Sequence, residues 1–319
     1  MLQQRLCWHV PEQIRQAPQP QRFKDGRQGH PTSREQRRTA APDGGWDALF
    51  PWRTNRGRQN LELIVRPDAD AAALLTARLI ADRIRAKPDL VLGLATGRTM
   101  ERVYDRLAAM NLDFSRCRSF NLDEYIGLQA GDEHSYRRYM DERLFSRINI
   151  LPTNTHVPNG RAADLDAEAA RYEGLIREFG GIDVQLLGIG EAGHIGFNEP
   201  LSALMSRTRQ KALTPATRQQ NAAMFGGDAD RVPARALTMG VGTILDAREL
   251  LLLATGQAKA KILAKAVEGP ITAMISASAL QLHPCCKVVV DEGAASALTQ
   301  RDYYDWVFQN EPEWEAYRD

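Results

Sequence analysis

A single histidine lies in a glycine-rich segment, residues 188–200, with the sequence Gly-Ile-Gly-Glu-Ala-Gly-His-Ile-Gly-Phe-Asn-Glu-Pro. Glycines on both sides of His194 let the backbone come close to a ligand, because glycine has no bulky side chain. Glu199 follows five residues later and could orient or polarise the imidazole, which titrates near neutral pH. A histidine with a purely structural role is the alternative. The density of glycines after a predicted buried strand favours a catalytic His194 supported by Glu199.

Two adjacent carboxylates follow another predicted strand, in the sequence Asn-Leu-Asp-Glu-Tyr of residues 121–125. Successive side chains of an extended chain point in opposite directions, so only one of Asp123 and Glu124 can face a crevice. A carboxylate at that position can move a proton beside a carbonyl group. A solvated carboxylate or a helix cap is the alternative.

Two further turns carry groups that bind anions. Residues 93–99 read Gly-Leu-Ala-Thr-Gly-Arg-Thr, so a predicted strand passes through a short turn into a helix that begins near Met100. Free N–H groups at a helix N-terminus attract anions, and threonine hydroxyls add donors. The glycine spacing excludes a Walker A loop and a dinucleotide-binding turn, and an ordinary strand–helix turn remains the alternative. Lys259, in Thr-Gly-Gln-Ala-Lys after another strand, is either solvated or a point charge for a phosphate.

Six short apolar segments supply the strands that must position these groups, at residues 61–65, 90–95, 117–122, 182–190, 249–255 and 287–291. Amphipathic stretches between them predict helices, the first capped by Asp68 and ending before Pro88, and others at about 99–110, 164–179 and 257–268. This alternation predicts an α/β fold: a doubly wound, mostly parallel sheet with helices on both faces, Rossmann-like. Ligands bind beyond the carboxyl ends of such strands, where the residues above are found.

The charge of the chain is balanced overall and uneven along its length. The 319 residues carry 41 Lys/Arg and 40 Asp/Glu, a formal net charge of +1, which gives no reason to expect specific nucleic-acid binding. Residues 1–60 hold 11 Lys/Arg and 5 Asp/Glu, a balance of +6, and the rest of the chain has 30 and 35, a balance of −5. Residues 1–60 also lack hydrophobic periodicity. We therefore predict a disordered basic extension over 1–60 and a folded domain over 61–319.

Membrane and redox signals are weak. No stretch approaches the roughly 18 to 20 apolar residues that a bilayer-spanning helix needs, so we expect a soluble protein without a membrane partner. The four cysteines, Cys7, Cys117, Cys285 and Cys286, show neither the spacing of a disulfide framework nor that of a metal site. No secretory signal is recognisable, which favours the cytoplasm.

Several collinear motifs resemble those of the glucosamine-6-phosphate deaminase family. They cover about residues 61–292 and read, in order, GLATGRT, FNLDEYIGL with His-Ser-Tyr at 134–136, LGIGEAGHIGFNEP, SRTRQKALT, VPARALTMGVGTILDA, TGQAKA, AVEGPIT and LQLHP. The 6-phosphogluconolactonases share the fold and a related Gly-His turn, but the Phe-Asn-Glu-Pro after the histidine favours the deaminase branch. The resemblance implies isomerisation of glucosamine-6-phosphate to fructose-6-phosphate with release of ammonia, in amino-sugar catabolism, without metal or organic cofactor.

The resemblance also implies roles for individual residues. Asp123 would move a proton from C2 to C1 of the sugar, and His194, supported by Glu199, would open the pyranose ring. The residues at the positions of the family's 6-phosphate site are Thr96, Gly97, Arg98, Thr99 and Lys259. Residues that match an activator site are Ser202, Arg209 and Lys211, with Ala203 where a serine is common. This second set implies regulation by N-acetylglucosamine-6-phosphate.

Two positions depart from the family pattern. Ala192 stands where an acidic or amide residue usually lies two places before the histidine, and Glu191 is the neighbour that could replace it. Ala223 occupies the place of a phosphate-binding arginine, while Arg98 replaces a glycine and could supply the charge. Alternatives are therefore a weakened or non-catalytic sugar-phosphate-binding homologue, or a deaminase for the galactosamine epimer. The oligomeric state is left open, with a homo-oligomer among the options.

Overall fold

Seven strands form one parallel sheet, the centre of the described chain. The structure is a computed structural model that describes residues 60–318, so the predicted basic extension falls, apart from Asn60, outside the described residues. In spatial order the strands are β1 (Asn60–Arg66), β10 (Cys285–Asp291), β9 (Glu249–Ala254), β6 (Val184–Leu187), β2 (Val91–Leu94), β3 (Arg118–Asn121) and β5 (Thr155–His156). Every neighbouring pair is parallel. The predicted α/β fold with a mostly parallel sheet is confirmed.

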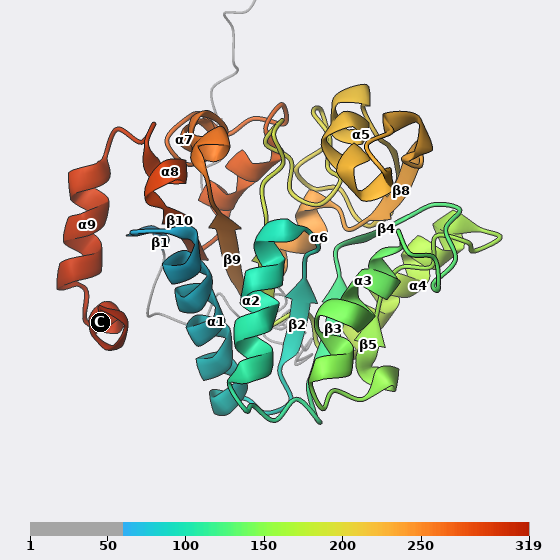
Figure 1. Cartoon of the computed structure of the whole chain (residues 1–319), viewed down its shortest axis with the longest axis horizontal. Coiled ribbons are helices and arrows are strands. Elements are labelled where there is room, and N and C mark those ends of the chain that lie inside the picture. Colours follow the sequence, from blue (N-terminus) through green and yellow to red (C-terminus); the bar gives the residue numbers. More distant parts are fainter. Residues whose placement is uncertain (1–59, 319) are drawn as a thin grey trace, which may run out of the picture. The chain divides into compact units, whose positions relative to one another are not determined.

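Helices connect and cover these strands (Figure 1). They are α1 (Ala69–Ala86), α2 (Arg98–Ala109), α3 (Tyr136–Arg143), α4 (Leu165–Glu178), α5 (Pro215–Asn221), α6 (Val241–Leu245), α7 (Ala260–Val267), α8 (Glu292–Ala295) and α9 (Arg301–Asn310). Short 3-10 helices lie at Phe145–Arg147, Pro152–Asn154, Ala222–Phe225, Ala229–Arg231, Gln257–Lys259, Ser276–Leu282 and Pro312–Tyr317. The predicted helix at 257–268 is thus a 3-10 turn followed by α7.

Helix α1 shows how the sequence produces these elements. The side chain of Asp68 accepts a hydrogen bond from the N–H of Ala71 at 2.8 Å, which caps the helix as predicted. The predicted apolar stripe, Leu75, Leu79, Ile80 and Ile84, is buried against the sheet. The helix ends at Ala86, two residues before Pro88, because proline disfavours helical geometry in the residue before it. The hydrophobic period therefore decides which face of α1 meets the core.

The order of the strands reverses at β2 and β6, and the region beyond their carboxyl ends is the expected ligand crevice. From β1 the chain moves through β2 and β3 to β5 in one direction, then returns through β6, β9 and β10 in the other. Right-handed crossovers in opposite directions place α1 and α2 on one face of the sheet and α4 and α7 on the other. The adjacent strands β2 and β6 therefore form a topological switch point, where ligands bind in doubly wound sheets. The Thr96–Thr99 turn follows β2, and the His194 segment follows β6.

A second, three-stranded antiparallel sheet was not predicted. Its order is β4 (Asp123–Tyr125), β8 (Arg235–Thr238) and β7 (Arg209–Ala212). The N–H of Leu122 donates to Leu94 of the large sheet, while its carbonyl accepts from Met239 beside the small one. Asp123 therefore begins a separate strand instead of following β3 in the same sheet. The sequence concealed this sheet because β4 is three residues long and β7, Arg-Gln-Lys-Ala, has no apolar alternation.

The small sheet has its own aromatic core, next to the carboxylate of Asp123. Its buried members are Tyr125, Tyr136, Phe197, Leu213, Phe225, Val232 and Ala236. The larger core packs both faces of the seven-stranded sheet.

Three of the four cysteines lie in the described part of the chain, and these three, Cys117, Cys285 and Cys286, are free thiols. Cys7 lies outside the described residues. None of the helices in residues 60–318 has the length and apolar character required to span a bilayer.

Candidate active site

The Thr96–Thr99 turn presents unsatisfied backbone donors at the start of α2. Gly97 is the N-terminal cap of α2 with a φ of 121°, in the region that favours glycine, and no side chain caps the helix. The hydroxyl of Tyr139 donates to the carbonyl of Gly97 at 2.9 Å and holds the turn. Thr96 and Thr99 are partly exposed, and Arg98 is exposed. N–H groups left free at a helix N-terminus are suited to bind an anion.

Two glycines shape the histidine loop after β6. A Cβ atom on Gly190 would lie 2.0 Å from Nε2 of His194, so the imidazole occupies the space that any larger residue would fill. Gly193 has a φ of 80°, and its N–H donates to the carbonyl of Gly190 at 3.0 Å, which closes the turn. The glycine density recognised in the sequence therefore has a steric cause: it makes room for the ring of His194.

His194 is buried and faces Glu199. Its Nδ1 atom lies 3.7 Å from Oε2 of Glu199, and neither atom has a hydrogen-bond partner within residues 60–318. Burial lowers the pKa of His194, and the charge of Lys259 lowers it further, while Glu199 and Glu191 act in the opposite direction. The imidazole is therefore neutral at neutral pH and can accept a proton.

Glu199 is held from its other side by α5. Its Oε1 atom accepts hydrogen bonds from the N–H of Thr214 at 3.0 Å and from the hydroxyl of Thr214 at 3.2 Å. Thr214 is also the N-terminal cap of α5. One oxygen of the carboxylate is thereby anchored and the other is turned toward His194, which is the orientation that a supporting carboxylate requires.

Asp123 and Glu124 point in opposite directions, as the strand geometry predicts. The carboxylate of Glu124 accepts three backbone N–H groups, from Tyr125 at 2.8 Å, Tyr136 at 3.0 Å and Arg137 at 3.0 Å. Glu124 therefore joins β4 to the first turn of α3. The carboxylate of Asp123 is buried next to Gly196, where a Cβ atom would lie 3.4 Å from its Oδ2. Asp123 thus reaches the segment two residues after His194.

Burial decides the protonation of Asp123. Desolvation, with a smaller contribution from the charge of Glu124, raises the pKa of Asp123 to about 8. The apolar aromatic core beside it supplies that environment. A general base is most effective when its pKa lies near the working pH, so this carboxylate is suited to accept and return a proton.

Lys259 lies close enough to His194 to influence its ionisation. It ends the 3-10 turn that follows β9, and burial lowers the pKa of its ammonium group, an effect that Glu191 opposes. A partly desolvated cation beside free backbone donors is suited to hold a phosphate. Lys259 after β9 is thereby brought to the histidine loop that follows β6.

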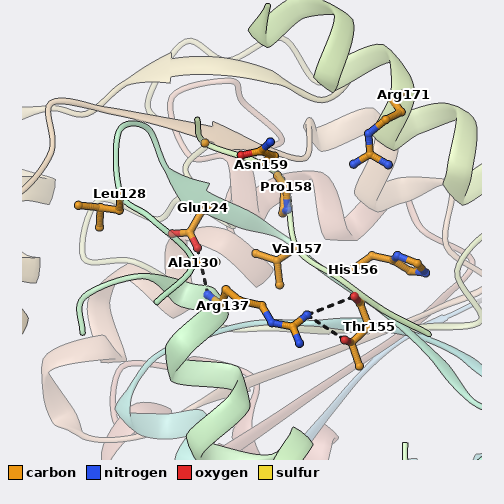
Figure 2. Close-up of a pocket in the computed structure, with 11 residues that line it drawn as sticks. Glu124, Leu128, Ala130, Arg137, Thr155, His156, Val157, Pro158, Asn159 and Arg171 are labelled. Carbon is orange, nitrogen blue, oxygen red and sulfur yellow. Dashed lines mark hydrogen bonds between the residues drawn. The ribbon is translucent and has the colours of Figure 1, made fainter. Parts of the chain in front are cut away.

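A separate hollow of about 220 Å³ lies on the Glu124 side of β4 (Figure 2). It is lined by Glu124, Leu128, Ala130, Arg137, Thr155, His156, Val157, Pro158, Asn159, Gly160 and Arg171. In Figure 2 the side chain of Arg137 reaches Thr155, to which it donates two hydrogen bonds. Arg171 is paired with Glu168. This hollow contains none of Asp123, His194 or Lys259, so it is distinct from the crevice.

The predicted activator-site residues lie on β7 and on the segment that follows the histidine loop. Arg209 donates to Ser202 at 3.1 Å and to Asn198 at 2.9 Å, and burial lowers its pKa. Lys211 lies two residues along β7 from Arg209, on the same face of the strand. Within residues 60–318, no three His, Cys, Asp or Glu side chains are grouped as metal ligands would be.

Both positions that depart from the family pattern carry alanine, whose side chain is a single methyl group. Ala192 is partly exposed in the histidine loop, and Ala223 is exposed in the 3-10 turn after α5. Glu191 is exposed. Burial lowers the pKa values of His194 and Lys259, and the charge of Glu191 opposes this lowering at both groups. Glu191 therefore acts on the imidazole of His194 through its charge.

Sequence reasoning missed Thr214, Tyr125 and Tyr136. Thr214 anchors Glu199, and the two tyrosines build the aromatic wall beside Asp123. Thr214 had a recognisable signal, because a threonine before proline marks a helix start. The tyrosines had no independent signal, since buried aromatic residues mostly serve as core.

A doubly wound fold with a buried imidazole and a facing carboxylate after a strand at its switch point is the architecture of an α/β enzyme site. The family described as glucosamine-6-phosphate isomerases/6-phosphogluconolactonase matches residues 68–290. This chain belongs to that family.

Relatives and solved structures agree with this assignment. The glucosamine-6-phosphate deaminase of Arthrobacter sp. (strain FB24) is 48% identical over 260 residues, covering 80% of this chain and 100% of the relative. That of Shewanella loihica is 50% identical over 248 residues, covering 76% and 92%. The structure of a monomeric glucosamine-6-phosphate deaminase superposes with a TM-score of 0.73 at 44% identity, covering 74% and 100%. A 6-phosphogluconolactonase from Leishmania guyanensis shares the fold, with a TM-score of 0.61 at 19% identity, covering 75% and 99%.

Proposed function

We propose that this chain is a glucosamine-6-phosphate deaminase, which converts glucosamine-6-phosphate and water to fructose-6-phosphate and ammonia. The observation that carries the proposal is the pair of buried groups, Asp123 and His194, in a chain that is 44–50% identical to relatives bearing that name. The mixed family contains lactonases as well, but the lactonase structures are only 18–20% identical.

In the proposed reaction His194 opens the sugar ring. A neutral imidazole can take the proton of the C1 hydroxyl and pass it to the ring oxygen, and Glu199 stabilises the charged imidazole that forms between these events. The lowered pKa of His194 keeps the ring neutral before substrate binds. The 3.7 Å between Nδ1 and Oε2 leaves the pair near hydrogen-bond distance once the ring is protonated.

Asp123 then isomerises the open chain. Its carboxylate removes the proton from C2 and returns it to C1, while a proton of the C2 amino group passes to the C1 oxygen, so that the amino aldose becomes a ketose imine without net loss of a proton. The pKa of about 8 makes both transfers accessible near neutral pH. Water breaks the C2–N bond of the imine and ammonia leaves. The enzyme is thus an isomerase whose final step is hydrolytic.

The 6-phosphate is proposed to bind the turn formed by Thr96, Gly97, Arg98 and Thr99, with Lys259 as its counter-charge. The uncapped N-terminus of α2 and the partly desolvated ammonium support this assignment. Exposed Arg98 is suited to take the role of the arginine that Ala223 replaces.

A second site, for a phosphorylated activator, is proposed at Ser202, Arg209 and Lys211. The hydrogen bond from Arg209 to buried Ser202 and the second cation on the same face of β7 support it. Titration of activity with N-acetylglucosamine-6-phosphate tests this site, and an Arg209→Ala variant should lose any activation. The cytoplasmic location and the oligomeric state stay predictions.

Ammonia release tests the proposed function directly. Purified full-length protein is incubated with glucosamine-6-phosphate, with galactosamine-6-phosphate and with 6-phosphogluconolactone, and ammonia, fructose-6-phosphate and acid production are measured. We expect ammonia and fructose-6-phosphate in equal amounts from the first substrate. Ammonia from the galactosamine epimer alone would change the substrate, and lactone hydrolysis without ammonia would overturn the proposal.

A further inference from the structure

Helix α5 is hydrogen-bonded to both ends of the histidine loop. At its N-terminus, Thr214 holds one oxygen of Glu199. Near its C-terminus, Oε1 of Gln220 accepts the N–H of Glu191 at 3.0 Å. Glu199 and Glu191 lie on either side of His194 in the sequence, and both charges influence its pKa. The position of α5 therefore decides where these two carboxylates stand relative to the imidazole.

The last residue of α5 begins a chain of hydroxyl contacts that reaches α3, and α3 in turn contacts the Thr96–Thr99 turn. Nδ2 of Asn221 donates to the hydroxyl of Tyr125 at 3.0 Å, and the hydroxyl of Tyr136 donates to the same oxygen at 3.3 Å. Tyr136 lies one turn before Tyr139 on α3, and the hydroxyl of Tyr139 donates to the carbonyl of Gly97 in the turn at 2.9 Å. The charge of Asp123 raises the pKa of both tyrosines, so the chain passes beside this carboxylate.

Packing alone does not account for the two tyrosines. Their ring centroids lie 4.9 Å apart, and the ring of Tyr125 is 5.5 Å from each of Phe197 and Phe225, contacts that phenylalanine would make equally well. A buried hydroxyl is unfavourable unless it is hydrogen-bonded. Burial raises the pKa of both tyrosines, to about 12 for Tyr125, so they stay neutral and serve as hydrogen-bonding groups.

We propose that Tyr136, Tyr125 and Asn221 are positioning residues that couple the Thr96–Thr99 turn to α5. Phosphate bound at the turn restricts Gly97 and the α3 residue Tyr139 that holds it, and the hydroxyl chain from Tyr136 transmits that restriction to the end of α5. The helix in turn orders Glu191 and Glu199 around His194. Binding energy from the distant phosphate is thereby used to arrange the groups that act on C1 and C2.

This coupling rests on the proposed function only in that the turn receives a phosphate. Hydrogen exchange tests it without turnover, with inorganic phosphate as the probe on the full-length protein. In the wild type, phosphate should slow exchange of the amides of the turn and of residues 216–221 of α5. In Tyr136→Phe and Tyr125→Phe, the turn should still be protected, while the protection of α5 should be lost.

Control variants separate coupling from stability. Tyr317→Phe removes a hydroxyl hydrogen bond to Asp82 far along the chain from the site and should keep the protection of α5. If a tyrosine variant fails to fold, Asn221→Ala tests the same link at a partly exposed position. Full protection of α5 in all three variants would overturn the coupling, as would phosphate that leaves the turn or α5 of the wild type unprotected.

Kinetics give a second readout. With glucosamine-6-phosphate, Tyr136→Phe and Asn221→Ala should each lower kcat about 10-fold with a smaller change in KM, as is typical when a supporting partner is lost. The double variant should be no worse than either single one, because both break the same chain. Additive losses would contradict a shared chain. A wild type without turnover but with phosphate-dependent protection of α5 would refute the proposed function and leave the coupling intact.

Discussion

Nδ1 of His194 and Oε2 of Glu199 lie 3.7 Å apart, both are buried, and neither is hydrogen-bonded to another group within residues 60–318. Two buried polar atoms without hydrogen bonds make the folded state less stable. The distance between these two atoms exceeds that of a normal hydrogen bond by less than 1 Å. Protonation of the imidazole would add a charge that attracts the carboxylate. The pair is therefore arranged to gain its interaction when His194 accepts a proton.

Replacing Glu199 by glutamine should weaken the attraction between residue 199 and the protonated imidazole of His194. The amide oxygen can still accept the hydrogen bonds of Thr214, so α5 keeps its anchor, while the charge beside His194 disappears. We expect kcat to fall roughly 10- to 100-fold, with little change in the melting temperature. Steady-state kinetics and thermal unfolding measure the two quantities. Unchanged kcat would remove Glu199 from the mechanism.

Replacing Asp123 by asparagine should abolish turnover and preserve substrate binding. The amide retains the shape of the carboxylate but cannot accept the C2 proton. Glu124→Gln is the matched comparison, because its carboxylate holds backbone N–H groups and should affect stability more than kcat. Isothermal titration and an ammonia assay separate binding from chemistry. Residual kcat in Asp123→Asn near the wild-type value would assign the base to another residue.

The raised pKa of Asp123 also predicts two dependences on pH. The base must be ionised, so kcat/KM should rise as the pH increases through about 8. His194 is already neutral at this pH, so its titration adds no further change in kcat/KM there.

The stability of the fold should also depend on pH, because in the folded state the carboxyl group of Asp123 favours its protonated form. Its contribution to stability is therefore present below pH 4, where the unfolded chain is also protonated, and is lost progressively up to about pH 8. Asp123→Asn should remove this loss and raise the melting temperature at pH 8 more than at pH 4.5.

Removing the ammonium of Lys259 should weaken phosphate binding. A charge-assisted contact contributes roughly 1.5 to 3 kcal/mol, which corresponds to about 10- to 100-fold in KM for the phosphorylated sugar. Lys261→Ala is the control, since that lysine is exposed on the same helical segment. Equal effects of the two substitutions, or none at Lys259, would contradict its placement in the phosphate site.

Restoring a carboxylate at Ala192 should accelerate ring opening. An additional partner for His194 stabilises its charged form, whereas Asp123 acts on the open chain and gains nothing. Ala192→Asp should therefore raise kcat on the cyclic amino sugar, while the reverse reaction from fructose-6-phosphate and ammonia, measured before ring closure, should change less. A flat or lower forward rate would mean that the loop is built around alanine, and the role of His194 would need revision.

The fold was predictable from local patterns because its elements satisfy local rules. The central strands are visible as short continuous apolar runs, and α1, capped by Asp68, is visible as an apolar stripe with a period of 3.6 residues. The short, polar β7 and the three-residue β4 were not predictable, because such strands are stabilised by their neighbours and not by their own composition.

The sequence by itself determined the inventory of the site: a histidine among glycines, a carboxylate pair on an extended segment, and an anion-binding turn after a buried strand. Which carboxylate enters the crevice was decided by tertiary structure, because only the three N–H groups from β4 and α3 show where Glu124 turns. The same holds for the pKa of Asp123 and the anchoring of Glu199 by Thr214. Desolvation and hydrogen bonds between distant segments depend on which surfaces meet, and local sequence does not contain that information.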